Sequence, residues 1–348
     1  MAAVDRFGFL FKEISDYFSN IRDILAFIGV LYASKKTLHY SYEVLKAVND
    51  HVLSKLSFIG DLRRRYGSWA VITGSSEGIG KAYARELARR KVNVVLISRG
   101  ENRLYKTARE IEEEFGVETC TVPVDFNLGP DVYSIIWNAI KDKEIGILVN
   151  NVGVMYDFPQ QFLDVPQERL WQLINVNVAA ATMMTYMVMP QMVERRKGAI
   201  VMMSSRACTQ ITPHMTIYAA TKSFLDYFAR SLQYEYKNTG VVVQSLKPFY
   251  VATRMTRYSK TLSKPSLLIP TADDYASSAI KTLGYSSRTS GYWPHTIQSW
   301  FSESIPEWLW MWGATRLNNA LRRQAEERLR LKSIARELSE QSLDSESS

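Results

Sequence analysis

From Trp69 onward, short runs rich in β-branched residues alternate with longer stretches in which apolar residues recur every three or four positions. The first such unit reads WAVITG, KAYARELARR, NVVLIS and RLYKTAREIEEEF. Later runs are TCTVPVD, IGILVNN, GAIVMMSS and VVVQSLKP, each separated from the next by enough chain for a crossover helix. The pattern predicts an α/β fold with a single doubly wound parallel sheet that helices cover on both faces.

The alternation runs without repeats or low-complexity sequence over residues 67–285, which predicts one domain there. Residues 1–66 before it carry apolar residues at helical spacing, which predicts an amphipathic, hydrophobic helical arm. This stripe consists of Phe7, Leu10, Phe11, Ile14, Phe18, Ile21 and Leu25. Residues 286–348 contain a tryptophan-rich segment and then LRRQAEERLRLKSIARELSEQ, whose mixed charges at helical spacing predict a solvated helical tail, with docking on anionic lipid as the alternative.

The arm contains one strongly apolar run, ILAFIGVLYA, at Ile24–Ala33. It is shorter than the roughly 18 to 20 residues that cross a bilayer, so a membrane-spanning helix is disfavoured. Lys35 and Lys36 follow the run, which fits attachment to a membrane interface, but a helix packed on the domain has the same pattern. Acidic residues such as Asp16 and Asp23 disfavour both a cleaved signal peptide and an ordinary transit peptide.

Composition narrows the class of protein. Hydrophobic residues make up 46% of the chain, which is ample for a buried core, and the formal net charge is +8. Apart from Arg63–Arg65 and the tail, the basic residues are scattered, so a nucleic-acid partner is not expected. The two cysteines, Cys120 and Cys208, lie far apart and give neither a disulfide framework nor zinc-ligand spacing, so no metal site is expected.

A glycine-rich loop follows the first strand. In TGSSEGIG, the residues Gly74, Gly78 and Gly80 precede a predicted helix. Glycines permit a tight turn and let a pyrophosphate approach the helix N-terminus, where free N–H groups favour an anion. An ordinary glycine-rich turn is the alternative, but a strand before the loop, a helix after it and a second strand about twenty residues further on favour a nucleotide. Ser76 and Ile79 of the same loop are expected to contact it.

The ends of the next strands bear on which nucleotide binds. An acid after the second strand would bind the ribose of NAD, but this chain has Ser98 and Arg99. An arginine suits a 2′-phosphate, so NADP(H) is expected in preference to NAD(H), with a solvated surface arginine as the alternative. Asp125, after the third strand, is placed to accept from the adenine amino group or to cap the next helix. In NNVG after the fourth strand, Asn150 and Asn151 are expected to join neighbouring strand ends, Asn151 also to contact the cofactor, and Gly153 to keep side chains clear of it, with an ordinary turn as the alternative.

Candidate catalytic residues lie around TIYAATKSF, where Tyr218 and Lys222 share one helical face. A chain with 19 tyrosines would show such spacing by chance, so the surroundings decide. Ser205 ends the fifth strand, and carbonyl reduction needs a hydride source, an acid for the developing alkoxide and a donor to hold the oxygen. Tyr218 would be the acid, Ser205 the donor, and the charge of Lys222 would lower the phenol pKa from about 10. Asn177, in INVNVAAA, would bind a water linking Lys222 to solvent.

Taken in order, TGxxxGxG, NNxG, Asn, Ser and YxxxK resemble the short-chain dehydrogenase/reductase family over roughly residues 67–285, and the resemblance implies a Rossmann fold. The stretches KAYARELARR, LVNNVGV, LQYEY, PFYVAT and PEWLWMWGA are similar to its 17-beta-hydroxysteroid and 3-ketoacyl reductase branch. The catalytic roles that the resemblance implies fall to Asn177, Ser205, Tyr218 and Lys222. Tyr218 and Lys222 are also expected to contact the cofactor, Lys222 at its ribose. It also implies that Val251 and Thr253 contact the cofactor, with Thr253 at the nicotinamide amide.

This chain departs from the family pattern at one position. The usual Pro-Gly after the sixth strand is Pro248-Phe249, which bears on the cofactor geometry. Some members of one subgroup carry phenylalanine in place of the catalytic tyrosine and are regarded as inactive, whereas this chain keeps Tyr218.

The expected function is that of an NADP(H)-dependent oxidoreductase that interconverts a hydroxyl and a carbonyl on an apolar substrate, of the steroid or long-chain 3-ketoacyl type. The apolar stretches SKPSLLIP and GYWPHTIQSWFSESIPEWLWMWGA stand where the family places its substrate lid, although core or membrane-interface aromatics are an equal alternative. The rival function is a catalytically inactive nucleotide-binding or protein-interaction module. A membrane surface and a homo-oligomer are further candidate partners, and the resemblance implies mitochondria or, alternatively, the endoplasmic reticulum membrane.

Overall fold

The computed structural model describes residues 2–53, 61–257, 259 and 261–346, which form two units, Met1–Val52 and Leu53–Ser348. The first unit is the helix α1 (Ala2–Val48), which continues into a π-helical turn at Asn49–Leu53. Residues 2–53 of the predicted arm are therefore helical.

Residues 21–42 of α1 are exposed without exception. Within this stretch, the run from Ile24 to Ala33 is apolar around the whole circumference of the helix, so it has no polar face of its own. Four members of the predicted stripe, Phe7, Leu10, Phe11 and Ile14, have side chains outside the described part of the structure, as do residues 54–60.

The second unit is built on a sheet of seven parallel strands in the order β3-β2-β1-β4-β5-β6-β7. The strands are β1 (Trp69–Thr73), β2 (Asn93–Ser98), β3 (Thr119–Pro123), β4 (Ile145–Asn150), β5 (Gly198–Met203), β6 (Val241–Leu246) and β7 (Arg288–Thr289). The first six coincide with the six predicted apolar runs. β7 has two residues and pairs with β6 through Ser245 and Leu246, just beyond residue 285.

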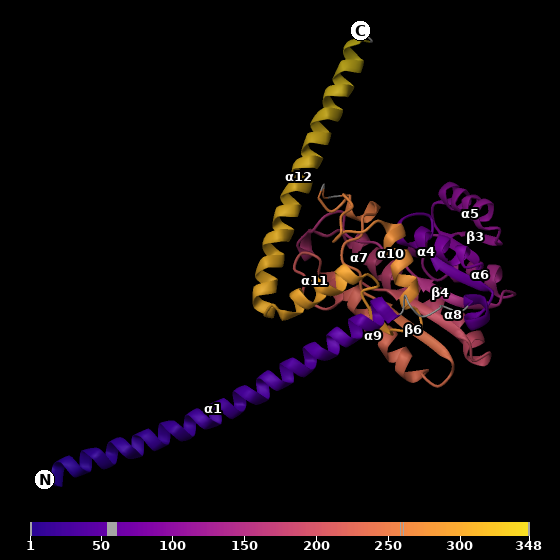
Figure 1. The fold of residues 1–348 in the computed structure, drawn as a ribbon. Coiled ribbons are helices and arrows are strands. Elements are labelled where there is room, and N and C mark those ends of the chain that lie inside the picture. The colour runs from indigo at the N-terminus through magenta and orange to yellow at the C-terminus, as the bar shows by residue number, and fades with distance from the viewer. Residues whose placement is uncertain (1, 54–60, 258, 260, 347–348) are drawn as a thin grey trace. The chain divides into compact units, whose positions relative to one another are not determined.

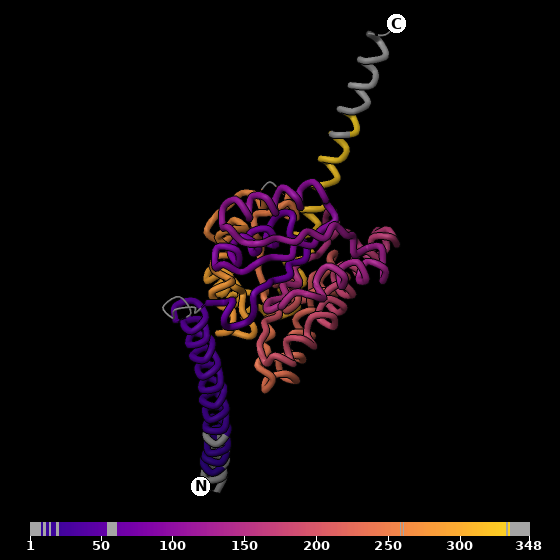
Figure 2. The backbone as a smooth tube through the Cα atoms, turned by 90° about the vertical axis from the view of Figure 1, so that its right-hand side faces the viewer, coloured from indigo at the N-terminus to yellow at the C-terminus, as the bar shows by residue number. Residues whose placement is uncertain are grey.

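Side chains alternate across this sheet and form two hydrophobic layers, as a buried parallel sheet requires. In β1, for example, Ala70 and Ile72 belong to one layer and Val71 to the other. The first layer packs against α3, α4, α5 and α10, and the second against α6, α8 and α9. Figures 1 and 2 show these helices around the sheet from two directions. The prediction of a doubly wound α/β domain is confirmed.

The helices of the second unit have the following bounds: α3 (Leu62–Tyr66), α4 (Gly78–Arg89), α5 (Glu101–Phe115), α6 (Val132–Ile140), α7 (Gln167–Ile174), α8 (Ala180–Glu194), α9 (Thr216–Glu235), α10 (Ala272–Ala279), α11 (Trp293–Ser304) and α12 (Glu307–Glu346). α3 lies within the predicted arm, but its Leu62 and Tyr66 are buried in the domain core.

Within the described residues, one helical stretch, Gln167–Glu194, is long and apolar enough to span a membrane. Half of its most apolar window is buried inside the protein.

The C-terminal segment packs on the domain through α11 and the first turns of α12. Trp310 Nε1 donates to the carbonyl of Ile211 at 3.1 Å, and Asn318 Nδ2 donates to that of Pro213 at 2.7 Å. Both acceptors lie in the loop between β5 and α9, so α12 covers a loop that follows the carboxyl end of a strand. In Figure 1, α12 leaves α11 as one long helix.

Candidate active site

The predicted site residues meet at one edge of the sheet because all seven strands are parallel, so their carboxyl ends lie at the same edge. The glycine loop follows β1, and Ser98 ends β2. Asn151 follows β4, and Ser205 follows β5. The first turns of α9 bring Tyr218 and Lys222 past the end of β5.

The glycine loop has the geometry of an anion site at a helix N-terminus. Gly74 and Gly78 have φ of +67° and +60°, a conformation that residues with side chains rarely adopt. Gly80 lies against the backbone, since a Cβ there would stand 2.3 Å from the carbonyl oxygen of Gly74. Glu77, the N-cap of α4, makes no side-chain capping bond. The N–H groups of the first turn are therefore available to a phosphate. The partly buried side chain of Ile79 packs against the hydrophobic core, and its predicted contact with the nucleotide stays a prediction.

The end of β2 carries a basic residue and no acidic one. The hydroxyls of Ser76 and Ser98 are 2.8 Å apart and join the glycine loop to β2. Arg99 is half exposed, and its Nη1 lies 3.9 Å from Oδ2 of Asp125. Asp125 also accepts from the Asn127 backbone N–H at 3.0 Å, so it caps the short 3₁₀ helix Phe126–Leu128. Capping, one of the two roles considered for Asp125, is thus present in the structure.

Asn151 joins the ends of β4 and β1. Its Nδ2 donates to the carbonyl oxygens of Thr73 and Gly74 at 2.9 and 3.2 Å. Its backbone N–H and that of Val152 both donate to the Thr73 hydroxyl at 3.0 Å. These bonds fix the glycine loop to the end of the neighbouring strand, which is the role predicted for Asn151.

The candidate catalytic trio forms where α9 crosses the end of β5. The Ser204 hydroxyl donates to the carbonyl of Lys222 at 2.7 Å, and Lys222 Nζ donates to that of Met203 at 2.9 Å. The side chains of Ser205 and Tyr218 are hydrogen-bonded to each other. Lys222 Nζ lies 5.8 Å from the centroid of the Tyr218 ring. The structure therefore brings Ser205, Tyr218 and Lys222 together as predicted, although their individual roles stay predictions.

Asn177 lies beside this trio, inside a π-helical turn at Asn175–Ala179 between α7 and α8. Its side chain is completely buried. The amide oxygen accepts from the Val154 N–H at 2.8 Å, and Nδ2 donates to the Val154 carbonyl and to the Thr221 hydroxyl at 2.9 and 3.0 Å. Asn177 thus fixes the chain after β4 to α9, a structural role that the sequence did not predict. Its predicted role toward water stays a prediction.

Gly153 makes room for the lysine. A Cβ at this position would stand 3.2 Å from Lys222 Nζ and 3.5 Å from the amide oxygen of Asn177. The glycine was predicted to keep side chains clear of the cofactor, and the structure adds that its hydrogen leaves space for the ammonium group.

Burial controls the ionisation of the pair. Tyr218 keeps some exposed area, but the protein around its hydroxyl raises the phenol pKa to about 12, against a smaller lowering by the hydrogen bond with Ser205. Burial also lowers the pKa of Lys222 to about 8. The sequence predicted a phenol pKa lowered by Lys222, and that direction is wrong for the protein alone. Desolvation disfavours both charged forms, and it is the largest cause of both shifts.

The loop after β6 also lies at the carboxyl end of the sheet. Val251 is buried, and the Thr253 methyl group lies 3.5 Å from the point where a Cβ on Gly78 would stand. The departure at Phe249 has a structural explanation, because its ring packs against the Arg206 guanidinium and the His295 ring, at 5.6 and 5.8 Å between centres. A glycine would leave that space unfilled.

Ion pairs across this edge were not predicted. Glu77 pairs with Arg254 at 3.1 Å and with Arg103 at 3.7 Å, so the glycine loop is linked to the loop after β6 and to the start of α5. Glu77 and Arg254 are 177 residues apart, and nothing in the sequence pattern pairs two such distant charges. The three side chains are about half exposed, so each pair contributes little stability, in the range of 0 to about 1 kcal/mol.

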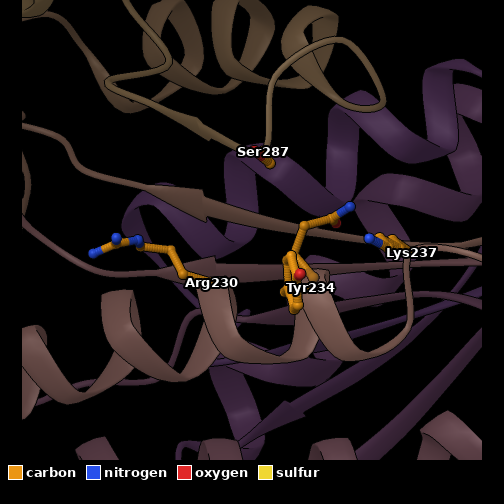
Figure 3. A pocket seen from close by; sticks show the side chains of 5 residues that line it. Arg230, Tyr234, Lys237 and Ser287 are labelled. Atoms are coloured by element: carbon orange, nitrogen blue, oxygen red, sulfur yellow. The ribbon is translucent and has the colours of Figure 1, made fainter.

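A pocket with a cavity volume of about 320 Å³ lies elsewhere on the domain (Figure 3). It is lined by Arg230, Gln233 and Tyr234 of α9, by Lys237 just after this helix, and by Ser287. Arg230 follows Tyr218 by roughly three helical turns, so the pocket is separate from the candidate catalytic trio.

Comparison with known proteins agrees with this geometry. The family model described as short chain dehydrogenase matches residues 68–263, more than half of the chain, so the chain belongs to the short-chain dehydrogenase family. Hydroxysteroid dehydrogenase-like protein 1 of Gallus gallus is 49% identical over 93% of this chain and 98% of its own length. Inactive hydroxysteroid dehydrogenase-like protein 1 of Homo sapiens is 47% identical with the same coverage. Very-long-chain 3-oxoacyl-CoA reductase of Macaca fascicularis is 45% identical over 74% of this chain and 81% of its own length.

Solved structures share the fold. A 7beta-hydroxysteroid dehydrogenase aligns with 73% of this chain and 99% of its own, with a TM-score of 0.67 and 24% identity. A short-chain dehydrogenase from Sphingobium yanoikuyae in complex with NADPH aligns with 61% of this chain and 82% of its own, with a TM-score of 0.56 and 29% identity. The predicted family, its branch and the Rossmann-type fold are confirmed, and a fold of this family binds a nicotinamide cofactor.

Proposed function

We propose that the protein is an NADP(H)-dependent oxidoreductase that interconverts a hydroxyl and a carbonyl group on an apolar substrate. One observation carries the proposal: Ser205, Tyr218 and Lys222 converge beside the glycine loop at the carboxyl edge of the sheet. A nicotinamide nucleotide fits the residues present, because the α4 N-terminus is uncapped by a side chain and Arg99 stands after β2. When bound, the nucleotide supplies or accepts the hydride.

In the direction of reduction, the chain's own residues hold the carbonyl and supply the proton. The Ser205 hydroxyl donates a hydrogen bond to the substrate oxygen and holds it near Tyr218. The Tyr218 hydroxyl then gives its proton to that oxygen as negative charge develops. A protonated Lys222 stabilises the resulting phenolate, and this interaction opposes the burial that otherwise keeps the phenol neutral. Asn177 keeps Val154 and α9 in place around the reacting atoms.

The substrate class follows from the relatives and from the surroundings of the site. One relative is named for very-long-chain 3-oxoacyl-CoA, and others for hydroxysteroids. The segments after Thr253 also expose several large apolar side chains, including Leu267, Leu268 and Trp293. These observations support an apolar ketone or the corresponding alcohol.

A second candidate function is a catalytically inactive nucleotide-binding or interaction module. The observation that favours it is the word inactive in the names of several relatives between 41% and 47% identical. The tyrosine, lysine and serine present in this chain argue for the enzyme.

A screen of purified protein separates the two candidates. NADPH oxidation is followed against a panel of steroid ketones and 3-ketoacyl thioesters, and NADPH binding is measured in parallel by titration. Turnover of any panel member at a rate that Tyr218→Phe abolishes supports the enzyme. Tight NADPH binding with no turnover across the panel supports the inactive module instead.

For the cell, we propose attachment of α1 to a membrane surface and a mitochondrial location, with the endoplasmic reticulum membrane as the alternative. The support for attachment is the apolar circumference of α1 between Ile24 and Ala33, followed by Lys35 and Lys36. The support for the organelle is the resemblance to hydroxysteroid dehydrogenase-like protein 1. Imaging of the tagged full chain against markers for both organelles tests the location.

A further inference from the structure

Arg206 directly follows Ser205, and its side chain is buried, with 5% of its surface exposed. Its guanidinium reaches α11 instead of solvent. Nε and Nη2 donate to the Ser302 hydroxyl at 3.2 and 2.7 Å, Nη2 also donates to the Ser299 carbonyl at 3.4 Å, and Nη1 pairs with the Glu303 carboxylate at 2.6 Å. These contacts hold the guanidinium in one orientation, because turning it away would leave a buried positive charge without its partners.

A second residue of α11 contacts the other active-site loop. His295 is completely buried, and its Nδ1 accepts from the backbone N–H of Phe249 at 3.3 Å. The His295 ring is enclosed by the rings of Phe249, Tyr275 and Tyr292, at centroid distances of 5.8, 6.0 and 5.2 Å. The loop held in this way continues into Val251 and Thr253, the residues expected at the cofactor.

The two loops are also joined to each other. The backbone N–H of Arg206 donates to the carbonyl of Pro248 at 2.8 Å, and the Arg206 guanidinium lies over the Phe249 ring. The Gln210 side-chain amide bonds the carbonyl of Ser302 as well. α11 therefore lies across the chain segments that follow β5 and β6, and its contacts fall beside Ser205 on one and before Val251 on the other.

We propose that Arg206 and His295 are positioning residues through which α11 sets the geometry of the active site. Arg206 orients Ser205 toward Tyr218, and His295 holds the loop that carries Val251 and Thr253. This inference rests on the proposed function, but its structural part is measurable without a substrate. It predicts that the two residues affect different steps, since one stands next to the donor for the carbonyl and the other before the cofactor loop.

The test uses the full chain with Arg206→Met, which keeps side-chain length and removes the charge, and His295→Phe, which keeps a ring and removes the acceptor. In Arg206→Met, kcat should fall about 100-fold with NADPH affinity within about twofold of wild type, because a displacement of about 1 Å in a catalytic group has that effect. In His295→Phe, NADPH affinity should weaken several-fold. Arg206→Lys, which can still pair with Glu303, should recover part of the lost kcat.

Hydrogen exchange supplies the readout that needs no substrate. Arg206→Met should speed amide exchange at residues 205–211, and His295→Phe at residues 249–253, while β1 and β2 keep wild-type protection. The matched control is Arg195→Met, because Arg195 also bonds a backbone carbonyl, that of Ile145, but at the opposite end of the strands. It should leave exchange at both loops unchanged.

The outcomes separate this inference from the proposed function. Local exchange changes at the two loops support the positioning role even if no ketone is ever reduced, in which case only the proposed function fails. If wild type is active and Arg206→Met loses kcat without any change at residues 205–211, the positioning role is overturned. The positioning role is also overturned if amide exchange in both variants rises by the same factor in every segment of the domain, because that result shows global destabilisation.

Discussion

Lys222 Nζ lies 5.8 Å from the centroid of the Tyr218 ring and donates to the carbonyl of Met203 at the end of β5. The lysine is thereby fixed between the phenol of α9 and the strand end from which Ser205 emerges. The backbone of α9 and the end of β5 places Tyr218, Lys222 and Ser205. The position of Lys222 beside the phenol is therefore set by the fold and not only by contact between the two side chains.

Tyr218→Phe is the direct test of proton donation. It removes one hydroxyl and keeps the ring, so NADPH binding and thermal stability should stay near wild type. Turnover should fall by about 10²- to 10⁴-fold, the effect of losing a general acid. Tyr227→Phe is the matched control, since Tyr227 lies on the same helix but is 71% exposed. A lower melting temperature with no kinetic effect in Tyr218→Phe would show that the residue only packs.

The pH dependence of reduction should report Lys222. Its pKa is about 8 because burial disfavours the ammonium form, and reduction needs that form to stabilise the phenolate. The value of kcat/KM for a ketone should therefore fall about tenfold per pH unit above roughly pH 8. In Lys222→Arg, whose guanidinium keeps its charge far above this range, any residual activity should extend to higher pH. A wild-type profile that stays flat to pH 10 would contradict the assignment.

Arg99→Ala tests the choice of cofactor. One charge-assisted contact to a 2′-phosphate is worth about 1.5 to 3 kcal/mol, so NADPH binding should weaken by about 10- to 150-fold and NADH binding should hardly change. Arg109→Ala, at an exposed position on α5, is the control and should affect neither nucleotide. Isothermal titration with both nucleotides gives the two ratios, and an equal loss for both would remove the case for NADP(H).

The stability of the domain should depend on pH through His295. Burial lowers the pKa of this histidine to about 4, so the unfolded chain binds a proton between pH 6.5 and 4 and the folded protein does not. Stability is therefore complete above pH 6.5 and falls as the pH drops toward 4, by on the order of 3 kcal/mol for this group. His295→Phe should show a shallower loss in urea melts over that interval. Equal slopes in both proteins would rule out His295 as the cause.

Membrane attachment of α1 is testable by vesicle flotation. Wild type should float with phosphatidylcholine vesicles that contain phosphatidylserine, because the apolar run can enter the interface and the following lysines can contact anionic headgroups. The double variant Phe27→Ser with Leu31→Ser should stay largely at the bottom of the gradient. The control is Tyr227→Ser with Tyr234→Ser, which removes from the domain two aromatic rings that are 71% and 74% exposed. Wild type that does not float would end the attachment proposal.

Much of the fold was predictable because its signals are local. Each of the first six strands lies in a short run rich in β-branched or other apolar residues, and the glycine loop stands between a strand and a helix. β7 gave no comparable signal, since Arg288 and Thr289 form a strand only by pairing with β6. α3 was also not predicted as part of the domain. Its Leu62 and Tyr66 are buried in the domain core, but the residues around them in the sequence carry no pattern that indicates this.

The site was predictable as a set of residues but not as an electrostatic environment. Tyr218 and Lys222 are linked by helical spacing, and Ser205 by its place at a strand end. The direction of the Tyr218 pKa shift depends on how much protein surrounds the hydroxyl, which spacing does not reveal. The contacts of Arg206 with Ser302 and Glu303 were equally out of reach, because they join residues 96 and 97 positions apart.

The π-helical turn at Asn175–Ala179 restricts which insertions and deletions the chain can survive. A π turn holds one residue more than an α turn, so removing a single residue there would restore a regular α-helix. That deletion would rotate Asn177 by about 100° relative to one of its flanking helices and separate it from Val154 and Thr221. Substitutions at exposed positions of this turn keep the orientation of Asn177, whereas the deletion of one residue changes it. An active descendant of this chain is therefore expected to vary here in composition while its length stays constant.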